Sequence, residues 1–315
     1  MSRLKHRTDG DGWVECDCGQ RHWGIYGSAG LMLVDPVRGV LLQHRAHWSH
    51  HGGTWGVPGG ARASGEGPLD GAVREAHEEA AIPPGLVRPS HAWVEDHGPW
   101  SYTTIVATAD GPVDAYASDP ESLAISWMPI DDVAGLPLLP AFGTLWPSIR
   151  EQAFRRLVLV VDAANVVGSR PDGWWHDRAG ATAKLRNNLT GAGPLPAADL
   201  HLPATSWWPQ IHLVVEGDAR AVDEAPADHA LPDDDGTDVS TQTHQQLSSM
   251  RRSVTIERAP GSGDDTIVDV TAGAVGQRPD DHVVVVTADR ELRRRVEEVG
   301  ATTIGPGTLQ RVLDA

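Results

Sequence analysis

At 315 residues the chain is long enough for two domains of ordinary size, and its hydrophobic fraction of 40% is sufficient to bury substantial cores. Its formal charge of −17 repels nucleic acid at long range, so any nucleic-acid role would require a local basic patch. The only two cysteines, Cys16 and Cys18, exclude a disulfide framework and favour a reducing compartment.

The N-terminal segment carries no targeting signal that we can identify. The stretch MSRLKHRTDGDGW lacks the apolar core of a signal peptide, and no apolar run approaches the ~20 residues of a membrane span. We therefore expect a cytoplasmic protein that does not bind membranes, with residues 1–24 as an N-terminal extension. Within it, CDCGQRHWG offers Cys16, Cys18 and His22 as zinc ligands. A structural zinc site needs four ligands and no second cysteine pair follows, so the pattern favours a turn.

Residues 25–150 alternate short β-like runs with turns. The predicted strands have the sequences IYGSAGLMLVD, GVLLQHR, TWGVPGG, HAWVEDH, SYTTIVATA and LAISWMPID. One helix is predicted over 69–80 and a second in LLPAFGTLWPSIREQAF. Strand runs around one or two helices are typical of an α+β domain.

The helix predicted over 69–80 has two distinct faces. Its apolar face carries Leu69, Ala72, Val73, Ala76 and Ala80. Glu75, Glu78 and Glu79 share another face, where they repel one another at i,i+3 and i,i+4 spacing and lie toward the helix C-terminus, whose dipole disfavours anions. A solvated acidic face is one interpretation, but only Arg74 adjoins it. A divalent cation such as Mg²⁺ or Mn²⁺ would relieve the repulsion, because it prefers hard carboxylate oxygens.

The residues before this helix make the pattern more specific. Gly59 and Gly60 let the backbone approach a ligand closely, and Glu66 lies on the intervening loop. Gly60, Glu66 and the run REAHEEAAI at 74–82 resemble the Nudix box, Gx5Ex7REUxEExGU, and TWGVPGG resembles the strand that leads into it. The resemblance covers roughly residues 25–150 and implies the α+β Nudix fold, a mixed sheet with flanking helices.

The Nudix resemblance implies a Mg²⁺ or Mn²⁺ ion that holds a nucleoside diphosphate linked to another group, while water attacks the diphosphate. By position it makes Glu75, Glu78 and Glu79 the metal-binding carboxylates, with a carbonyl of Gly59 or Gly60 as a further ligand. Arg74 would orient the glutamates and Glu66 would support the loop. The general base in this family is a box glutamate or an acid from a later loop. The candidates in later loops are Glu95, Asp96 and Glu121, and the candidate substrate contacts are Gly59, Gly60, Asp96 and Glu121.

Two positions depart from the box. Ala76 is smaller than the usual aliphatic residue, which affects packing only. Ala81 replaces the glycine that closes the helix, and in a left-handed conformation alanine costs about 1 kcal/mol. Pro83 and Pro84 end the helix in any case, so the expected ligands stay in place.

A different rhythm begins near residue 156. RLVLVVDAANVV has the pattern of a buried strand, DRAGATAKLRNNL is compatible with a helix, IHLVVEG with a strand, and VVVVTADRELRRRVEEVG with a strand and a helix. This alternation predicts an α/β domain over 156–315, with a parallel sheet covered on both faces. Residues 221–249 are acidic and poor in large apolar residues, so they are predicted to be a flexible insertion.

Acidic residues occur at or just after the predicted strand ends of this half. They are Asp162, Glu216, Asp265 and Asp289. Carboxyl ends of parallel strands face one crevice, so these side chains could converge, although a single Asp at such a position is commonly an N-cap. DAANVV, GDDTIV and VTADREL resemble a PIN-like, Rossmann-like domain of the NYN type, whose members include metal-dependent ribonucleases. The resemblance implies Mg²⁺ or Mn²⁺ on Asp162, Asp265 and Asp289. It also implies substrate contact by Asn165 and assistance from Asp264 or Glu216.

RNA is the partner that this second resemblance implies. The acidic insertion argues against tight RNA binding, and the one plausible surface of cations and aromatic rings lies in and after GSRPDGWWHDR. Its members are Arg170, Arg178, Arg186, Trp174 and Trp175. The alternative is that the two tryptophans pack against the sheet or the neighbouring domain.

These features together predict a Mg²⁺-dependent hydrolase of a nucleotide-type diphosphate with an appended PIN-like domain. Two other functions stay open. One is a ribonuclease whose Nudix domain senses nucleotides, and the other is a non-catalytic, nucleotide-binding regulator.

Overall fold

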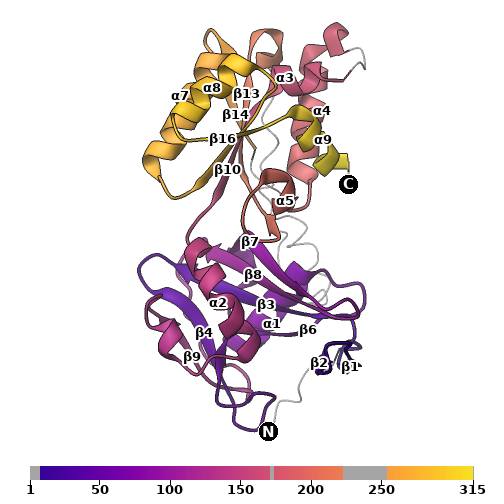
Figure 1. Ribbon diagram of the computed structural model, residues 1–315, viewed down its shortest axis with the longest axis vertical. Coiled ribbons are helices and arrows are strands. Elements are labelled where there is room, and N and C mark those ends of the chain that lie inside the picture. The colour runs from indigo at the N-terminus through magenta and orange to yellow at the C-terminus, as the bar shows by residue number, and fades with distance from the viewer. Residues whose placement is uncertain (1–7, 171–173, 223–253, 315) are drawn as a thin grey trace, which may run out of the picture. The chain divides into compact units, whose positions relative to one another are not determined.

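The computed structural model describes residues 8–170, 174–222 and 254–314. These residues form two compact units, one up to Phe154 and one from Arg155 onward (Figure 1). The predicted insertion at 221–249 lies, apart from its first two residues, outside the described ranges. No helix within these ranges is long and apolar enough to cross a membrane.

The first unit is built on a mixed sheet. Its strands are β3 (Ser28–Asp35), β4 (Gly39–Arg45), β5 (Trp55–Gly56), β6 (Gly59–Ala61), β7 (Val87–Asp96), β8 (Ser101–Ala109) and β9 (Ser122–Met128). The strand order is β7-β8-β3-β4-β5, with β6 paired to β3 and β9 paired to β4. β3 and β8 run parallel, whereas β7 with β8 and β4 with β9 run antiparallel. The predicted mixed sheet is therefore confirmed.

Two α-helices and two short 3₁₀ segments complete the body of this unit. They are α1 (Pro68–Ala80), η1 (Pro84–Leu86), η2 (Val133–Gly135) and α2 (Pro140–Gln152). Ala72, Ala76 and Ala80 are fully buried along α1, and their small side chains let the helix backbone approach the sheet closely. α2 contributes Phe142 and Trp146 to a separate apolar cluster with the sheet. The glutamates of the candidate site, Glu75, Glu78 and Glu79, are carried by α1.

Ahead of the sheet, β1 (Trp13–Glu15) and β2 (Arg21–Trp23) form an antiparallel hairpin of their own. We call residues 13–23 the arm. In Figure 1 it lies at the edge of the first unit, in the darkest colour. Strands of three residues bury little apolar surface, so such a hairpin needs support from its surroundings.

The second unit contains a five-stranded parallel sheet. Its strands are β10 (Leu157–Asp162), β13 (Gln210–Val215), β14 (Val254–Arg258), β15 (His282–Val286) and β16 (Thr302–Ile304). Their order is β14-β13-β10-β15-β16, and every neighbouring pair is parallel. A small antiparallel pair, β11 (Leu195–Pro196) and β12 (Ser206–Trp207), accompanies it. The central strand β10 is buried at all six of its positions.

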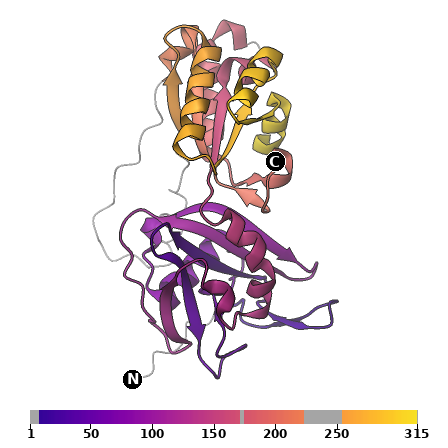
Figure 2. The same cartoon turned by 60° about the vertical axis from the view of Figure 1, so that its left-hand side comes forward.

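Helices cover both faces of this parallel sheet (Figures 1 and 2). They are α3 (Ala163–Gly168), η3 (Trp174–His176), α4 (Arg178–Gly191), α5 (Ala197–Leu200), η4 (Gly217–Ala221), α7 (Gly263–Gln277), α8 (Arg290–Glu298) and α9 (Pro306–Asp314). Leu159 and Val161 of β10 pack into the cluster that includes α3, α4 and α9. Val160 packs on the opposite side, in the cluster that includes α7 and α8. The predicted parallel sheet with two covered faces is confirmed.

One local prediction is corrected by the fold. The sequence predicts Asp265, in GSGDDTIVD, at or just after a strand end, but β14 ends at Arg258 and Gly263 begins the helix α7, with Ser262 as its N-cap. Asp264 and Asp265 therefore lie in the first turn of a helix. Carboxylates are favoured there by the helix dipole and by the unpaired backbone N–H groups.

Candidate active site

The box residues lie on one loop and one helix of the first unit. Gly59 and Gly60 belong to β6, which pairs antiparallel with β3, and the chain then runs through Glu66 into α1. The two glycines lie beside the face of α1 that carries the box glutamates, and the side chains of Glu75 and Glu79 both approach the glycine backbone.

The exit of α1 contains the residue that departs from the box. Ala81 adopts φ 55° and ψ 28°, the left-handed conformation that favours glycine. Its N–H donates to the carbonyl oxygen of His77 at 3.0 Å. The N–H of Ile82 donates to the carbonyl oxygen of Ala76 at 3.3 Å. The bond from Ala81 to His77 is the 5→1 bond of the αL motif, so the helix closes as a glycine at position 81 would close it.

Arg74 ties the loop to the helix. Its Nε and Nη2 donate to the two carboxylate oxygens of Glu66 at 2.8 and 2.9 Å. Its Nη1 donates to Glu75 at 2.8 Å and lies 3.5 Å from Glu78, while Nη2 also donates to the carbonyl of Ala61 at 2.9 Å. Burial lowers the pKa of Arg74, but Glu66 and Glu75 outweigh that effect and raise it above its usual value. Arg74 therefore stays charged and holds two box glutamates in place.

Glu79 is the buried carboxylate of this group. Its relative exposure is 5%, and its Oε2 accepts a hydrogen bond from the N–H of Gly59 at 2.9 Å. Burial, together with the charges of Glu75 and Asp119, raises the pKa of Glu79 to about 8. A buried carboxylate beside other acids is stabilised in its charged form by a nearby cation.

The two glycines of β6 are required for steric reasons. A Cβ atom on Gly60 would lie 2.7 Å from the carboxylate of Glu75. A Cβ atom on Gly59 would lie 2.5 Å from the carbonyl oxygen of Ala29 on β3. The carboxylate of Glu75 is thus packed directly against the Gly60 backbone, where any larger residue would displace it.

Two acids from the loop before β9 complete the cluster. Glu79, Asp119 and Glu121 each place a carboxylate oxygen within 4.8 Å of the others. Glu121 was expected from the sequence as a later-loop acid, but Asp119 was not singled out. Oδ1 of Asp119 accepts hydrogen bonds from the backbone N–H of Glu121 at 3.2 Å and from the hydroxyl of Ser122 at 3.0 Å. These bonds fix the loop so that its acids meet Glu79.

Arg45, at the end of β4, is a second residue that sequence reasoning missed. Its Nε donates to the carbonyl oxygen of His50 at 3.1 Å. Its positive charge lowers the pKa of Glu79, against the effect of burial. Arg45 therefore supplies a cation beside the acidic cluster, where an anionic substrate would arrive.

The other two later-loop acids have local partners in the β7–β8 hairpin. Glu95 lies 2.9 Å from Nε2 of His97. Asp96 accepts a hydrogen bond from the N–H of Gly98 at 2.8 Å, which caps the turn. In the part of the chain that the structure describes, neither belongs to the acids grouped around Glu79. Their roles in substrate binding or catalysis stay predictions.

The donor set fits a hard divalent cation. The carboxylates of Asp119 and Glu121 converge on the buried Glu79, and Glu75 lies against a glycine backbone that leaves room for no side chain. Carboxylate and carbonyl oxygens are the ligands that Mg²⁺ and Mn²⁺ prefer. Glu78 is the most exposed of the three box glutamates, with 34% of its side chain accessible, and it lies on the outer side of the group.

Comparisons with known proteins identify the family of the first unit. The family model described as the NUDIX domain matches residues 26–151, all within the first unit. A Mycobacterium tuberculosis protein, provisionally named 8-oxo-dGTP diphosphatase 3, is 47% identical over 154 residues, which cover 46% of this chain and 70% of that protein. The chain belongs to the Nudix hydrolase family.

Two further relatives extend the comparison of the Nudix unit. A Bifidobacterium longum nucleoside triphosphate pyrophosphatase/Nudix hydrolase fusion protein is 51% identical over 146 residues. That match covers 44% of this chain and spans only 30% of the length of the fusion protein. The crystal structure of the Nudix hydrolase RenU from M. smegmatis also matches the first unit. The sequence identity is 44%, the TM-score is 0.42, and the match covers 45% of this chain and 94% of RenU.

The second unit brings acids together at the carboxyl edge of its parallel sheet. Asp162 ends β10, where its Oδ1 caps α3 through the N–H of Asn165 and its Oδ2 accepts from the hydroxyl of Thr287, both at 3.0 Å. Burial, together with the charges of Asp264 and Glu216, raises the pKa of Asp162. Asp162 is therefore both an N-cap, as the sequence allowed, and a member of an electrostatically coupled acidic group.

The two neighbouring aspartates of α7 have different surroundings. Asp265 forms an ion pair with Arg295 at 2.6 Å, with 67% of its side chain exposed. Burial, together with the charge of Asp289, raises the pKa of Asp264. The charges of neighbouring acids thus act on Asp264, whereas Asp265, to which the resemblance gives a metal, is paired with an arginine. Asp289 itself caps α8 through the N–H of Leu292 at 2.9 Å.

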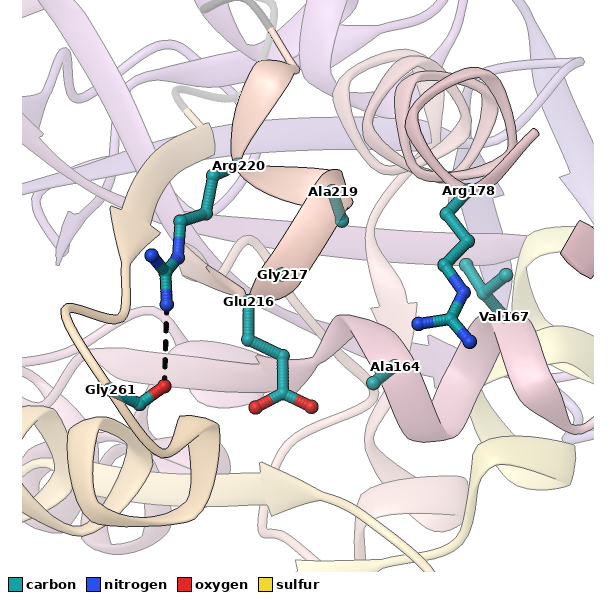
Figure 3. A pocket seen from close by; sticks show the side chains of 8 residues that line it. All are labelled: Ala164, Val167, Arg178, Glu216, Gly217, Ala219, Arg220 and Gly261. Atoms are coloured by element: carbon teal, nitrogen blue, oxygen red, sulfur yellow. Dashed lines mark hydrogen bonds between the residues drawn. The ribbon is translucent and has the colours of Figure 1, made fainter.

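Asn165 and Glu216 also lie at this edge. Oδ1 of Asn165 accepts from the N–H of Ala288 at 2.9 Å, and Oε2 of Glu216 accepts from the N–H of Gly263 at 2.8 Å. Glu216 also lines an open pocket of about 340 Å³, together with Arg178 and Arg220 (Figure 3). The pocket therefore combines one carboxylate with two guanidinium groups.

The basic and aromatic residues expected to meet RNA lie on several elements of the second unit. Arg170 pairs with Asp314 at 2.7 Å, Nη2 of Arg186 donates to Asn187 at 2.8 Å, and Arg178 lines the pocket of Figure 3. Trp175 is exposed, whereas the side chain of Trp174 lies outside the described part of the structure. RNA binding by these residues stays a prediction.

Proposed function

We propose that the Nudix unit hydrolyses a phosphoanhydride bond in a nucleotide-type substrate, with Mg²⁺ or Mn²⁺ as the metal. The observation that carries this proposal is the group formed by Glu79, Asp119 and Glu121 around a buried carboxylate. Glu79 accepts a hydrogen bond from the N–H of Gly59 and lies beside two other acids, and a divalent cation would offset the repulsion among these carboxylates.

The residues of the chain have separate tasks in this reaction. Glu75, Glu78 and Glu79 hold the metal, and Arg74 and Glu66 keep two of these carboxylates oriented through their hydrogen bonds. A divalent metal in such a site clamps the phosphate oxygens and makes bound water easier to deprotonate. Arg45 faces the negative charge of the phosphates.

Glu121 is our candidate for the general base. Among the three later-loop acids that the sequence offered as candidates, Glu121 is the one that lies beside Glu79, whereas Glu95 is engaged with His97. A half-buried carboxylate in this position can accept the proton of the attacking water. Glu121→Gln should then lower kcat by about 100-fold and leave KM nearly unchanged. Asp110→Asn, at an exposed position just after β8, serves as the control and should leave kcat within a factor of about two.

Nucleoside triphosphates are the first substrate class to test. One relative is named as an 8-oxo-dGTP diphosphatase and another as a nucleoside triphosphate pyrophosphatase fusion protein. The experiment is a hydrolysis panel with Mg²⁺ that contains the common nucleoside triphosphates, 8-oxo-dGTP, ADP-ribose and dinucleoside polyphosphates. Turnover of one class supports the proposal. Binding with thermal stabilisation but without turnover would instead support the nucleotide-binding regulator.

We propose as a second candidate function that the other unit is a PIN-like, metal-dependent nuclease. The observation that favours it is the position of Asp162 near Asp264 and Glu216, whose charges, together with burial, raise the pKa of Asp162, while Glu216 is held at the start of α7 by the N–H of Gly263. The adjoining pocket adds Arg178 and Arg220, whose guanidinium groups suit a phosphodiester backbone. Mn²⁺-dependent cleavage of RNA that is abolished by Asp162→Asn, but not by Glu79→Gln, would support this function and the sensor role of the Nudix unit. Absence of cleavage with either metal would contradict it.

A further inference from the structure

The arm and the β7–β8 turn lie far apart in the sequence. Together they bring four side chains that can ligate a metal close to one another. Cys16, Cys18 and His22 belong to the arm, and His97 follows β7. One ligand atom from each of the four lies within 4.8 Å of all the others. The three arm residues alone were insufficient for a structural zinc site, and the fold supplies a fourth ligand.

The turn of the arm presents its cysteines in a fixed geometry. The N–H of Gly19 donates to the carbonyl of Cys16 at 2.9 Å, and Gly19 has φ 82°, which a glycine adopts without strain. The backbone N–H of Cys18 lies 3.5 Å from Sγ of Cys16, a contact that would support a thiolate. Sγ of Cys18 lies 3.2 Å from Nε2 of His22. The tight turn therefore directs both sulfur atoms toward the same point.

His97 approaches this point from the main sheet. Its ring centroid lies 4.7 Å from that of His22. Glu95 lies 2.9 Å from Nε2 of His97, so it can fix the orientation of this imidazole. A carboxylate that orients a metal-ligating histidine is a common outer partner in zinc sites.

Trp100 joins the two segments beside the cluster. Its ring stacks on His22 with the centroids 4.1 Å apart and the planes at 11°. Its Nε1 donates to the carbonyl of Trp23 at 3.0 Å. The ligands are thus held close by packing before any metal binds, which reduces the ordering that binding would require.

We propose that Cys16, Cys18, His22 and His97 form a structural Zn²⁺ site that fastens the arm to the β7–β8 hairpin. Two sulfur and two nitrogen donors suit zinc, whereas the oxygen-rich Nudix site suits Mg²⁺. In a tetrahedral zinc site the ligand atoms are about 3.5–3.8 Å apart, so small rotations of these side chains would close the shell. Four protein ligands leave no open position, which makes the site structural.

The zinc site would stabilise an element that is too short to stand alone. The arm pairs only three residues on each strand. Trp13 on the arm packs edge-on against His50, with the ring centroids 5.1 Å apart, and so the arm supports the loop that follows Arg45. Loss of zinc should therefore loosen this side of the first unit, while the second unit keeps its stability.

The first test measures metal in the full-length protein. After purification without chelators, or reconstitution with Zn²⁺ under reducing conditions, the wild type should contain about one zinc ion per chain. Cys18→Ser and His97→Gln should lower the content at least about tenfold after dialysis. Asp17→Asn, between the cysteines, and His47→Gln, on a nearby loop, should retain it. A wild type that takes up no zinc, or a His97→Gln variant that keeps all of it, would overturn the proposal.

A second test needs no substitution in the site, because the chain has only two cysteines. Both thiols should react slowly with a thiol reagent in the zinc-loaded wild type and fast after chelation. Co²⁺ in place of Zn²⁺ should give the intense absorption of tetrahedral thiolate coordination, and Glu79→Gln should leave that absorption unchanged. Equal thiol reactivity with and without zinc, or Co²⁺ spectra that respond only to Glu79→Gln, would contradict the assignment.

Discussion

Ala81 holds a left-handed backbone conformation, with φ 55°, at the end of the helix that carries the box glutamates. Alanine is strained there because its Cβ approaches the backbone, whereas glycine is not. Ala81→Gly should therefore raise the free energy of unfolding of the first unit by about 1 kcal/mol and its Tm by about 2–4 °C.

The control for Ala81→Gly lies one residue earlier. Ala80 is fully buried inside α1, so Ala80→Gly should destabilise the same unit through lost helix propensity and packing. Thermal and denaturant unfolding of both variants measure these shifts. A lower stability for Ala81→Gly would mean that the strain at this position is relieved elsewhere.

His282 makes stability depend on pH in the second unit. Burial and the charge of Arg155 lower its pKa, and its ring packs edge-on against Trp207 with the centroids 5.0 Å apart. In the unfolded chain His282 binds a proton near the ordinary histidine pKa of about 6.5. In the folded chain the same side chain binds that proton only at lower pH. Stability from this group is present above that pH and is lost as the pH falls below it.

Denaturant unfolding at about pH 7.5 and about pH 5.5 measures this effect. The wild type should lose more stability between the two values than His282→Gln does. His176→Gln, at an exposed position of η3, should behave like the wild type. If the wild type and His282→Gln lost equal stability, the folded protein would accommodate the protonated ring of His282 without cost.

At the scale of the elements, the contact between β6 and α1 positions the metal-binding carboxylates. A Cβ atom at Gly60 would lie 2.7 Å from the carboxylate of Glu75, so Gly60→Ala must displace that side chain. We expect a drop in hydrolysis of about tenfold or more and a higher Mg²⁺ requirement. Gly85→Ala has no atom within 4 Å of its added Cβ and should leave both unchanged. Normal metal dependence in Gly60→Ala would place Glu75 outside the metal site.

The elements also explain which parts of the site the sequence could predict. The helix α1 has an apolar stripe on one face, and Arg74 and Glu75 belong to its charged face. Both the position of the helix and its acidic face therefore follow from the helical periodicity of the sequence. Asp119 lies in an irregular loop and His97 beyond a strand, where no periodicity operates. Their roles depend on pairing between strands that are distant in sequence, and a single chain does not reveal such pairing.

The same limit applied in the second unit. Apolar strands alternating with helices indicated a parallel sheet, because such strands are buried on both faces. The helix α7 was not predicted, since its first turn contains Gly263 and two aspartates that also suit a loop. The residue at which α7 begins sets the surroundings of both aspartates. The charges of neighbouring acids act on Asp264, and Asp265 pairs with Arg295.

At the scale of the whole molecule, the two acidic sites belong to separate compact units. Their chemistry should therefore be separable by substitution. Asp162→Asn should leave phosphoanhydride hydrolysis within a factor of about two, since the residue lies outside the Nudix unit. Glu79→Gln should leave the unfolding of the second unit unchanged. If Asp162→Asn abolished hydrolysis while both units remained folded, the two sites would act together.

The measurement that most directly tests the central claim is Mg²⁺-dependent hydrolysis of the best nucleotide substrate by the wild type and by Glu79→Gln. Loss of the buried carboxylate should lower kcat/KM by at least about 100-fold, because several kcal/mol of transition-state stabilisation depend on the metal that it holds. Glu297→Gln, in the second unit, should retain the activity of the wild type. If Glu79→Gln retained that activity as well, the acids around Glu79 would not form the catalytic site.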